Sequence, residues 1–408
     1  VRVLRKTTEA VLQARAWVGR EGATIALALN GVYMPAEQRM TAAGKVTMAR
    51  DFKIAVFPGD GIGLEITDPC IAVIDAALAR IGGISLAYES VEAGAGAYQK
   101  LGTALPDESV ETARAADAIL LAAAGLPDIR YPDGTEIAPQ IELRAILDLY
   151  AGVRPIRSIP GVPSPLADPR GSELDFVIVR ESTEGLFVSH RKGNVRGDEE
   201  AEDRLLITRK GTERVVDATL HIAETRKAAG GRGHVTCIDK ANVFASYAFF
   251  RKVFDERAAR HPGLTTDHLY VDASTLDFVG RPWRFDVIVT ENMFGDILSD
   301  LGAGLIGGMG FAPSADIGDK HAVFQPCHGT APDIAGQGKA NPTAMFLSGA
   351  MMLEWLAERH DEPRTAEAGG LIRAAVDDAF RDGMRTWEIG GQSGVREVTD
   401  AVLSRLAA

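Results

Sequence analysis

The residues with the clearest chemical potential are two aspartates within the segment Phe285 to Gly310. The apolar, β-branched run Phe285 to Thr290 predicts a buried strand, and the helical spacing after it places Asp296 and Asp300 on one helix face. Like charges in that arrangement destabilise a helix unless water or a cation lies between them. Carboxylate oxygens with no Cys or His nearby are typical ligands of Mg²⁺ or Mn²⁺. A divalent metal site and a solvated acidic face are therefore the two interpretations.

Three arginines are predicted to lie at the ends of regular elements. Arg144 falls in an expected helix over Ile141 to Tyr150, Arg154 comes shortly after it, and Arg180 follows an expected strand over Phe176 to Val179. Each guanidinium can bind a carboxylate through charge-assisted hydrogen bonds that contribute about 1.5–3 kcal/mol apiece. Taken singly, each arginine is more simply explained by an ordinary surface ion pair.

Two further charged residues follow expected strands. Lys240 comes after a strand over His234 to Ile238, and Asp272 directly follows a strand over His268 to Val271. A lysine can move protons if burial lowers its pKa, although such a residue is more often a solvated strand end.

Strands and helices alternate along the chain. A strand over Phe52 to Phe57 leads through the glycine-rich turn Pro58 to Gly63 into a helix over Leu64 to Ile81. The turn fails the GxGxxG dinucleotide pattern because Leu64 stands where a glycine is needed, so it is interpreted as a loop that lets backbone approach a ligand. Phe324 to Pro342 has no helical or strand period, and a loop of that length needs a functional reason. The alternation predicts a doubly wound α/β fold.

Bulk properties restrict the class of protein. A chain of 408 residues predicts two or three domains, and a net charge of −12 argues against nucleic-acid binding. No window holds the 18 or more uninterrupted apolar residues of a membrane span. The three cysteines follow no CxxC pattern, an inventory typical of a reduced, cytoplasmic protein.

The first 47 residues differ from the rest in being rich in Lys and Arg and without clear periodicity. Since a credible first strand begins directly after Met48, we expect Met48 to be the natural start and residues 1–50 to be an extension outside the fold. A basic transit peptide is the alternative.

Six segments in order resemble the β-decarboxylating dehydrogenases, which act on isocitrate, 3-isopropylmalate, tartrate and homoisocitrate. They read PGDGIG, LDLYAGVRP, VRESTEG, DKANV, FDVIVTENMFGDILSD and HGTAPDIAGQGKANPTA, and the resemblance covers about residues 51–408. It implies the isopropylmalate dehydrogenase-like two-domain fold with a doubly wound mixed sheet. The large nucleotide-binding domain would comprise 51–149 plus 307–408, and 150–306 would form a small dimerising domain.

The resemblance also implies roles for the polar residues. The three arginines would bind the carboxylates of a hydroxy-diacid, with Asn242 as a further substrate ligand. Asp296 and Asp300 would hold Mg²⁺ or Mn²⁺ together with Asp272 of the partner subunit. Lys240 would relay a proton across the same homodimer, which is obligate because each site needs both chains.

The loop after Phe324 matches the family's adenosine-binding loop. The implied cofactor-binding residues are His328, Gly329, Ala331, Asp333, Ile334 and Asn341. Asp333 and Ile334 stand where NAD-dependent relatives carry an acidic and an apolar residue. Because a carboxylate accepts hydrogen bonds from ribose hydroxyls and repels a 2′-phosphate, NAD is the expected cofactor.

Two positions depart from the family pattern. Phe187 aligns with the tyrosine that protonates the enol, and Gln325 stands where relatives usually have Glu. Phe187 motivates an alternative from another class, a regulatory subunit that binds nucleotide and acid without turnover. Retention of the metal carboxylates and of Lys240 favours an enzyme.

The substrate is the least determined feature. Asp133 to Leu143 occupies the position where relatives recognise the malate substituent, and its mixed residues match no one pattern. NAD use and the LDLYAGVRP segment favour an isopropylmalate-like substrate, with tartrate, D-malate and isocitrate as alternatives.

Overall fold

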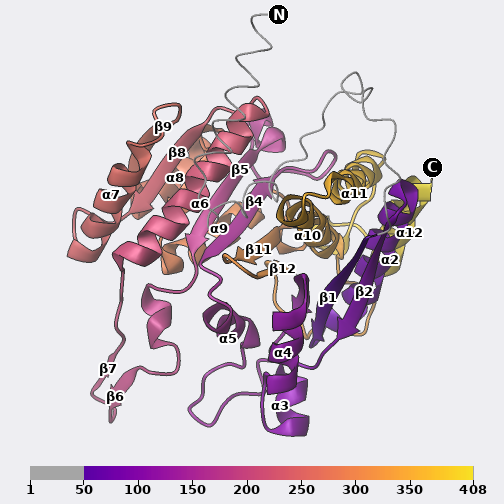
Figure 1. Ribbon diagram of the computed structural model, residues 1–408, viewed down its shortest axis with the longest axis horizontal. Coiled ribbons are helices and arrows are strands. Elements are labelled where there is room, and N and C mark those ends of the chain that lie inside the picture. The colour runs from indigo at the N-terminus through magenta and orange to yellow at the C-terminus, as the bar shows by residue number, and fades with distance from the viewer. Residues whose placement is uncertain (1–49, 408) are drawn as a thin grey trace, which may run out of the picture.

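The computed structural model describes residues 50–407 (Figure 1). The expected start at Met48 and the extension lie outside the described residues, apart from Arg50, which begins the first strand.

One mixed ten-stranded sheet organises the described chain. Its strands, in spatial order, are β2 (Ile84–Ser90), β1 (Arg50–Gly59), β3 (Ala118–Ala123), β12 (Ala322–Pro326), β11 (Pro313–Ile317), β4 (Ala151–Arg157), β5 (Asp175–Glu181), β10 (Val287–Thr290), β8 (His234–Asp239) and β9 (Thr265–Tyr270). The four strands at each edge are mutually parallel, while β11 pairs antiparallel with both β12 and β4, and β4 with β5. Two parallel halves therefore meet at a central antiparallel seam.

The α-helices of the described chain are α2 (Gly63–Ile81), α3 (Ala95–Leu101), α4 (Asp107–Ala115), α5 (Pro139–Ile146), α6 (Arg209–Ala228), α7 (Ala245–Ala258), α8 (Val271–Gly280), α9 (Asn292–Leu305), α10 (Thr343–His360), α11 (Pro363–Arg381) and α12 (Val395–Ala407). Several helices pack against the sheet, among them α2, α6, α7, α9 and α10, while α11 and α12 pack on other helices. In Figure 1, α2 and α10 to α12 gather together, with α10 against β11 and β12, and α6 to α8 lie around β5, β8 and β9. Every residue of α10 from Thr343 to Ala357 is buried, which explains its apolar sequence.

The fold class is confirmed, with differences at several boundaries. The helix expected to reach Tyr150 ends at Ile146, since Ala151 already pairs in β4. The long loop begins only after Pro326, because Phe324 to Pro326 complete β12, a strand whose burial on both faces leaves no alternation. A separate two-stranded sheet pairs β7 (Glu200–Glu202) antiparallel with β6 (Asn194–Arg196).

The division into two domains stays a prediction. Strands of 50–149 and 307–407 occupy one half of the sheet and those of 150–306 the other. The seam between β11 and β4 joins the two sets, and one apolar core cluster draws residues from both.

Candidate active site

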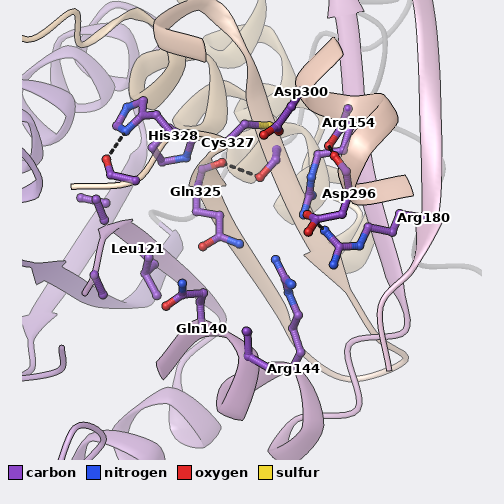
Figure 2. A pocket seen from close by; sticks show the side chains of 18 of the residues that line it. Leu121, Gln140, Arg144, Arg154, Arg180, Asp296, Asp300, Gln325, Cys327 and His328 are labelled. Atoms are coloured by element: carbon purple, nitrogen blue, oxygen red, sulfur yellow. Dashed lines mark hydrogen bonds and ion pairs between the residues drawn. The ribbon is translucent and has the colours of Figure 1, made fainter. Parts of the chain in front are cut away.

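A cavity of about 220 Å³ lies at the seam of the sheet (Figure 2). Its walls come from the end of β3, from α5, β4, β5 and α9, and from the segment that follows β12. The charged or polar side chains that line it are Gln140, Arg144, Arg154, Arg180, Asp296, Ser299, Asp300, Ser314, Gln325 and His328. Residues far apart in the sequence therefore meet at one polar site.

The three predicted arginines line this cavity together. Arg144 lies on α5, Arg154 on β4 and Arg180 on β5, with exposed fractions of 8%, 4% and 2%. Guanidinium groups buried to this degree require partners that offset their desolvation. The simpler interpretation of each as a surface ion pair is therefore wrong.

A buried aspartate on β11 holds two of these arginines. Asp316 accepts hydrogen bonds from Arg144 Nε at 2.9 Å and Arg154 Nη2 at 3.1 Å, and from Gln325 Nε2 at 2.7 Å. Burial alone would raise the pKa of Asp316, but the charges of the two arginines prevail and bring it to about 2. Gly152 lies opposite Asp316 in the β4–β11 pairing, where a Cβ would sit 3.1 Å from its Oδ1. No motif in the sequence indicates a role for Asp316.

Arg180 connects the arginine group to α9. Its Nε and Nη2 donate to Asn292 Oδ1 at 2.9 and 2.6 Å, and its Nη1 pairs with Asp296. The Arg180 guanidinium also lies 4.9 Å from the centroid of the Phe187 ring, within the range of a cation–π contact. Burial, with the nearby charge of Arg144, lowers the pKa of Arg180 to about 10, so the side chain is charged at neutral pH.

The paired aspartates lie on α9 as predicted. That helix begins after Glu291, whose side chain accepts from the backbone N–H groups of Met293 and Phe294. Asp296 and Asp300 share its cavity-facing side, beside Arg154 and Arg180 (Figure 2). Partial burial and the charge of Asp296 together raise the pKa of Asp300, as expected for two carboxylates facing one space.

These carboxylates suit a hard divalent cation in donor type but are too few to enclose one. Within residues 50–407 there is no group of three His, Cys, Asp or Glu side chains able to hold a metal ion. Asp272 in particular does not join Asp296 and Asp300 within one chain, nor does it line the cavity. The three predicted metal ligands therefore do not meet within one chain.

Asp272 and Lys240 instead form a separate pair. Lys240, just after β8, donates a hydrogen bond to Asp272 in the first turn of α8, and this bond lowers the pKa of the carboxyl. Asn242 lies exposed in the turn after β8. These three predicted site residues form one group outside the cavity of their own chain.

The predicted cofactor loop packs against the glycine-rich turn. Ile62 N donates to Thr330 O at 2.9 Å, and Thr330 Oγ1 donates to Gly125 O at 2.6 Å. Gly61, at φ +56°, is required here, since a Cβ would lie 2.3 Å from Thr330 O. The glycine-rich turn therefore supports the predicted cofactor loop, because its glycines let the two backbones approach each other closely.

The six predicted cofactor residues are distributed along this loop. His328 and Gly329 line the cavity, and Ala331 has a left-handed φ of 39°. Asp333 is exposed and Ile334 half-buried on the outer side of the loop. Asn341 is buried, and its Oδ1 accepts from Thr343 N and Oγ1 at the start of α10.

A second unpredicted carboxylate orders this region. Asp60 in the glycine-rich turn is 4% exposed and accepts from the backbone N–H groups of Ala95, Gly96 and Gly125 at 2.7–2.8 Å. It fixes the turn to α3 and to the segment after β3. In the sequence, this role is indicated by the position of Asp60 between two glycines of the PGDGIG motif.

The site thus combines buried arginines, paired carboxylates and a long loop on a glycine-rich turn, an arrangement suited to acting on a small carboxylate-bearing molecule. A family model described as isocitrate/isopropylmalate dehydrogenase matches residues 53–402. The chain is 39% identical over 355 residues to a 3-isopropylmalate/3-methylmalate dehydrogenase of Methanocaldococcus jannaschii, covering 87% of this chain and 98% of that protein. It is 37% identical over 364 residues to a probable tartrate dehydrogenase/decarboxylase of Bacillus subtilis, covering 88% and 98%.

A solved structure agrees with these relatives. Isocitrate dehydrogenase from Methylococcus capsulatus matches with a TM-score of 0.77 at 36% identity, covering 88% of this chain and 100% of that one. The chain belongs to the isocitrate/isopropylmalate dehydrogenase family, which confirms the expected resemblance. It is a decarboxylating hydroxy-acid dehydrogenase.

Proposed function

We propose that the protein catalyses the NAD-dependent oxidative decarboxylation of a 3-substituted (2R)-malate, with an isopropylmalate-like acid as the leading substrate. The observation that carries the proposal is the group of three buried arginines facing Asp296 and Asp300 across one cavity. The relatives' names include both isopropylmalate and tartrate enzymes, so tartrate or D-malate is the second candidate.

The chain's own residues would bind and orient the acid. Arg144 has both terminal nitrogens without a protein acceptor among residues 50–407, so they can donate to a substrate carboxylate. Arg154 is engaged more fully, because its Nη1 donates to Ala315 O and its Nη2 to Asp316. Arg180, fixed by Asn292, places positive charge beside the same space.

The divalent cation and the dinucleotide that this reaction needs both fit the residues present. Asp296 and Asp300, with Asp272 of the partner subunit, would hold Mg²⁺ or Mn²⁺, which stabilises negative charge on the substrate oxygens. The loop from His328 to Asn341 would hold NAD, the hydride acceptor, and exposed Asp333 favours free ribose hydroxyls over a 2′-phosphate.

A homodimer completes the proposed site. Large apolar side chains of 150–306 are exposed around the Lys240–Asp272 pair: Val243, Phe244, Leu276 and Val279, with Ile297 on α9. An exposed apolar patch of this kind marks an interface. Lys240 of the partner subunit would then move a proton at the cavity.

The proposed cellular location is the cytoplasm, on the basis of the cysteines. No helix among residues 50–407 is long and apolar enough to cross a membrane. The three cysteines are all free thiols, as in a reducing cytoplasm.

The test is NADH production from a panel of (2R)-malates, tartrate and isocitrate with Mn²⁺, repeated with NADP⁺. We expect turnover with NAD⁺ and the highest kcat/KM for an isopropylmalate-like acid. Asp296→Asn should abolish turnover, whereas Asp378→Asn, an exposed surface residue, should not. Thermal stabilisation by the acids without NADH formation would instead support a regulatory subunit, and a higher kcat/KM with NADP⁺ would contradict the cofactor assignment.

A further inference from the structure

The start of α2 holds the predicted cofactor loop at two points. At the near end of the loop, Ile62 N donates to Thr330 O at 2.9 Å. At the far end, the Glu65 carboxylate accepts from Gly336 N at 3.3 Å and from Gly338 N at 3.1 Å. Because Ile62 and Glu65 lie three residues apart, one helical turn fixes two points that are eight residues apart in the loop.

The backbone of Gly338 is bound on two sides. Its N–H donates to Glu65, and its carbonyl oxygen accepts at 3.0 Å from the N–H of Val395, the first residue of α12. Gly394 approaches so closely that a Cβ there would lie 1.8 Å from Gly338 O. Of these contacts, the one to Glu65 is made by a side chain, so a substitution can remove it without altering the backbone of the loop or of α12.

Apolar contacts fix the first half of the loop but not its far end. Ala331, Ile334 and Ala335 pack against the main apolar core. Residues 336–338 are exposed, and the two glycines among them have no side chain to pack. The contacts that hold the far end are therefore backbone hydrogen bonds, and Glu65 accepts two of them.

The far end lies between two predicted cofactor residues, Ile334 and Asn341, so its position affects how both are presented. Ordering a loop at the moment of binding weakens affinity, and a loop that is already fixed avoids this cost. Glu65 does not line the cavity, so its effect on binding is exerted through the loop. We infer that Glu65 is a positioning residue that fixes the far end of the cofactor loop and thereby raises the affinity for the dinucleotide. This inference rests on the proposed function, which assigns the dinucleotide to that loop.

A purely helical role for Glu65 can be separated from this one. An acidic residue in the first turn also stabilises a helix through the helix dipole, and that effect depends on charge. Glu65→Gln removes the charge but keeps one acceptor oxygen for the loop, whereas Glu65→Ala removes both. Asp68→Ala, at an exposed position one turn further along α2, is the matched control.

The experiment measures, by calorimetry, the Kd for NAD⁺ and separately the Kd for isopropylmalate with Mn²⁺. Hydrogen exchange over residues 333–341 is followed by mass spectrometry without ligands. Glu65→Ala should raise the Kd for NAD⁺ about tenfold and leave the Kd for isopropylmalate within about twofold of wild type. It should also speed exchange at the Gly336 and Gly338 amides, which lose their acceptor. Asp68→Ala should match wild type in all three measurements.

Glu65→Gln keeps the inference testable if Glu65→Ala does not fold. It removes one of the two hydrogen bonds and should raise the Kd for NAD⁺ about threefold. A Glu65→Gln protein that binds NAD⁺ as weakly as Glu65→Ala would assign the effect to the helix charge and overturn the inference.

Three further results would contradict the role of Glu65. They are an unchanged exchange rate in Glu65→Ala, faster exchange without a change in the Kd for NAD⁺, and equal weakening of NAD⁺ and isopropylmalate. A wild-type protein that binds neither NAD⁺ nor NADP⁺ would instead refute the proposed function, and this inference with it.

Discussion

At the scale of single residues, Phe187 is one of the two positions that depart from the expected family pattern. Its ring faces the Arg180 guanidinium, so it makes a stabilising contact with one of the arginines proposed to bind the substrate. It cannot supply a proton, however. Besides the charged residues, the polar side chains that line the same cavity are Gln140, Ser299, Ser314, Gln325, His328 and the partly buried Cys327, whose pKa burial raises to about 11.

Phe187→Tyr should therefore accelerate the steps after hydride transfer. A positioned phenol acting as general acid contributes on the order of 10²-fold or more where protonation limits the rate. We expect the ratio of 2-oxo acid product to CO₂ formed in single turnovers to rise toward one, with little change in substrate KM. Phe187→Leu, whose side chain also has no exchangeable proton, serves as the control. An unchanged product ratio in the tyrosine variant would show that protonation does not depend on this position.

At the scale of elements, sequence reasoning succeeded where a local pattern fixes the geometry. The i, i+4 spacing placed Asp296 and Asp300 on one face of α9, and β-branched runs located β5, β8 and β10. Asp316 could not be found in this way, since its partner Arg154 lies 162 residues away in the chain. Pairing of β11 with β4 brings them together, and no local pattern encodes that pairing.

The apolar surface of α8 gives a prediction at the same scale. Leu276 and Val279 are 75% and 60% exposed, so replacing Leu276 by Asp should destabilise the proposed dimer without unfolding the protomer. Light scattering after size exclusion should show a monomer, and activity should fall with it. Leu101→Asp, at an exposed position on α3, is the matched control. A dimer that survives Leu276→Asp would place the interface elsewhere.

At the scale of the whole molecule, the buried charge network joins the two halves of the sheet. Asp316 from β11 binds Arg154 from β4 and Arg144 from α5, so stability and substrate binding depend on the same contacts. Breaking such a pair by removing one partner leaves a buried charge uncompensated.

This coupling predicts how the free energy of unfolding depends on pH. Because the folded pKa of Asp316, about 2, lies below its unfolded value, the carboxylate stabilises the fold above about pH 4, and that contribution is lost as pH falls toward 2. Urea unfolding should show Asp316→Asn less stable than wild type by roughly 2 kcal/mol at pH 7, with the difference shrinking near pH 3. A difference independent of pH would mean that the carboxylate charge is not what stabilises this seam.

The account depends most on a site shared between two subunits, and mixing two inactive variants tests it directly. Lys240→Met and Asp296→Asn should each be inactive alone. In a heterodimer, one of the two sites combines the intact Asp296 of the Lys240→Met chain with the intact Lys240 of the Asp296→Asn chain. Because about half of randomly paired dimers are heterodimers, equimolar refolding should restore about one quarter of wild-type activity. Absence of any recovery, with heterodimers verified by differential tags, would contradict a shared active site.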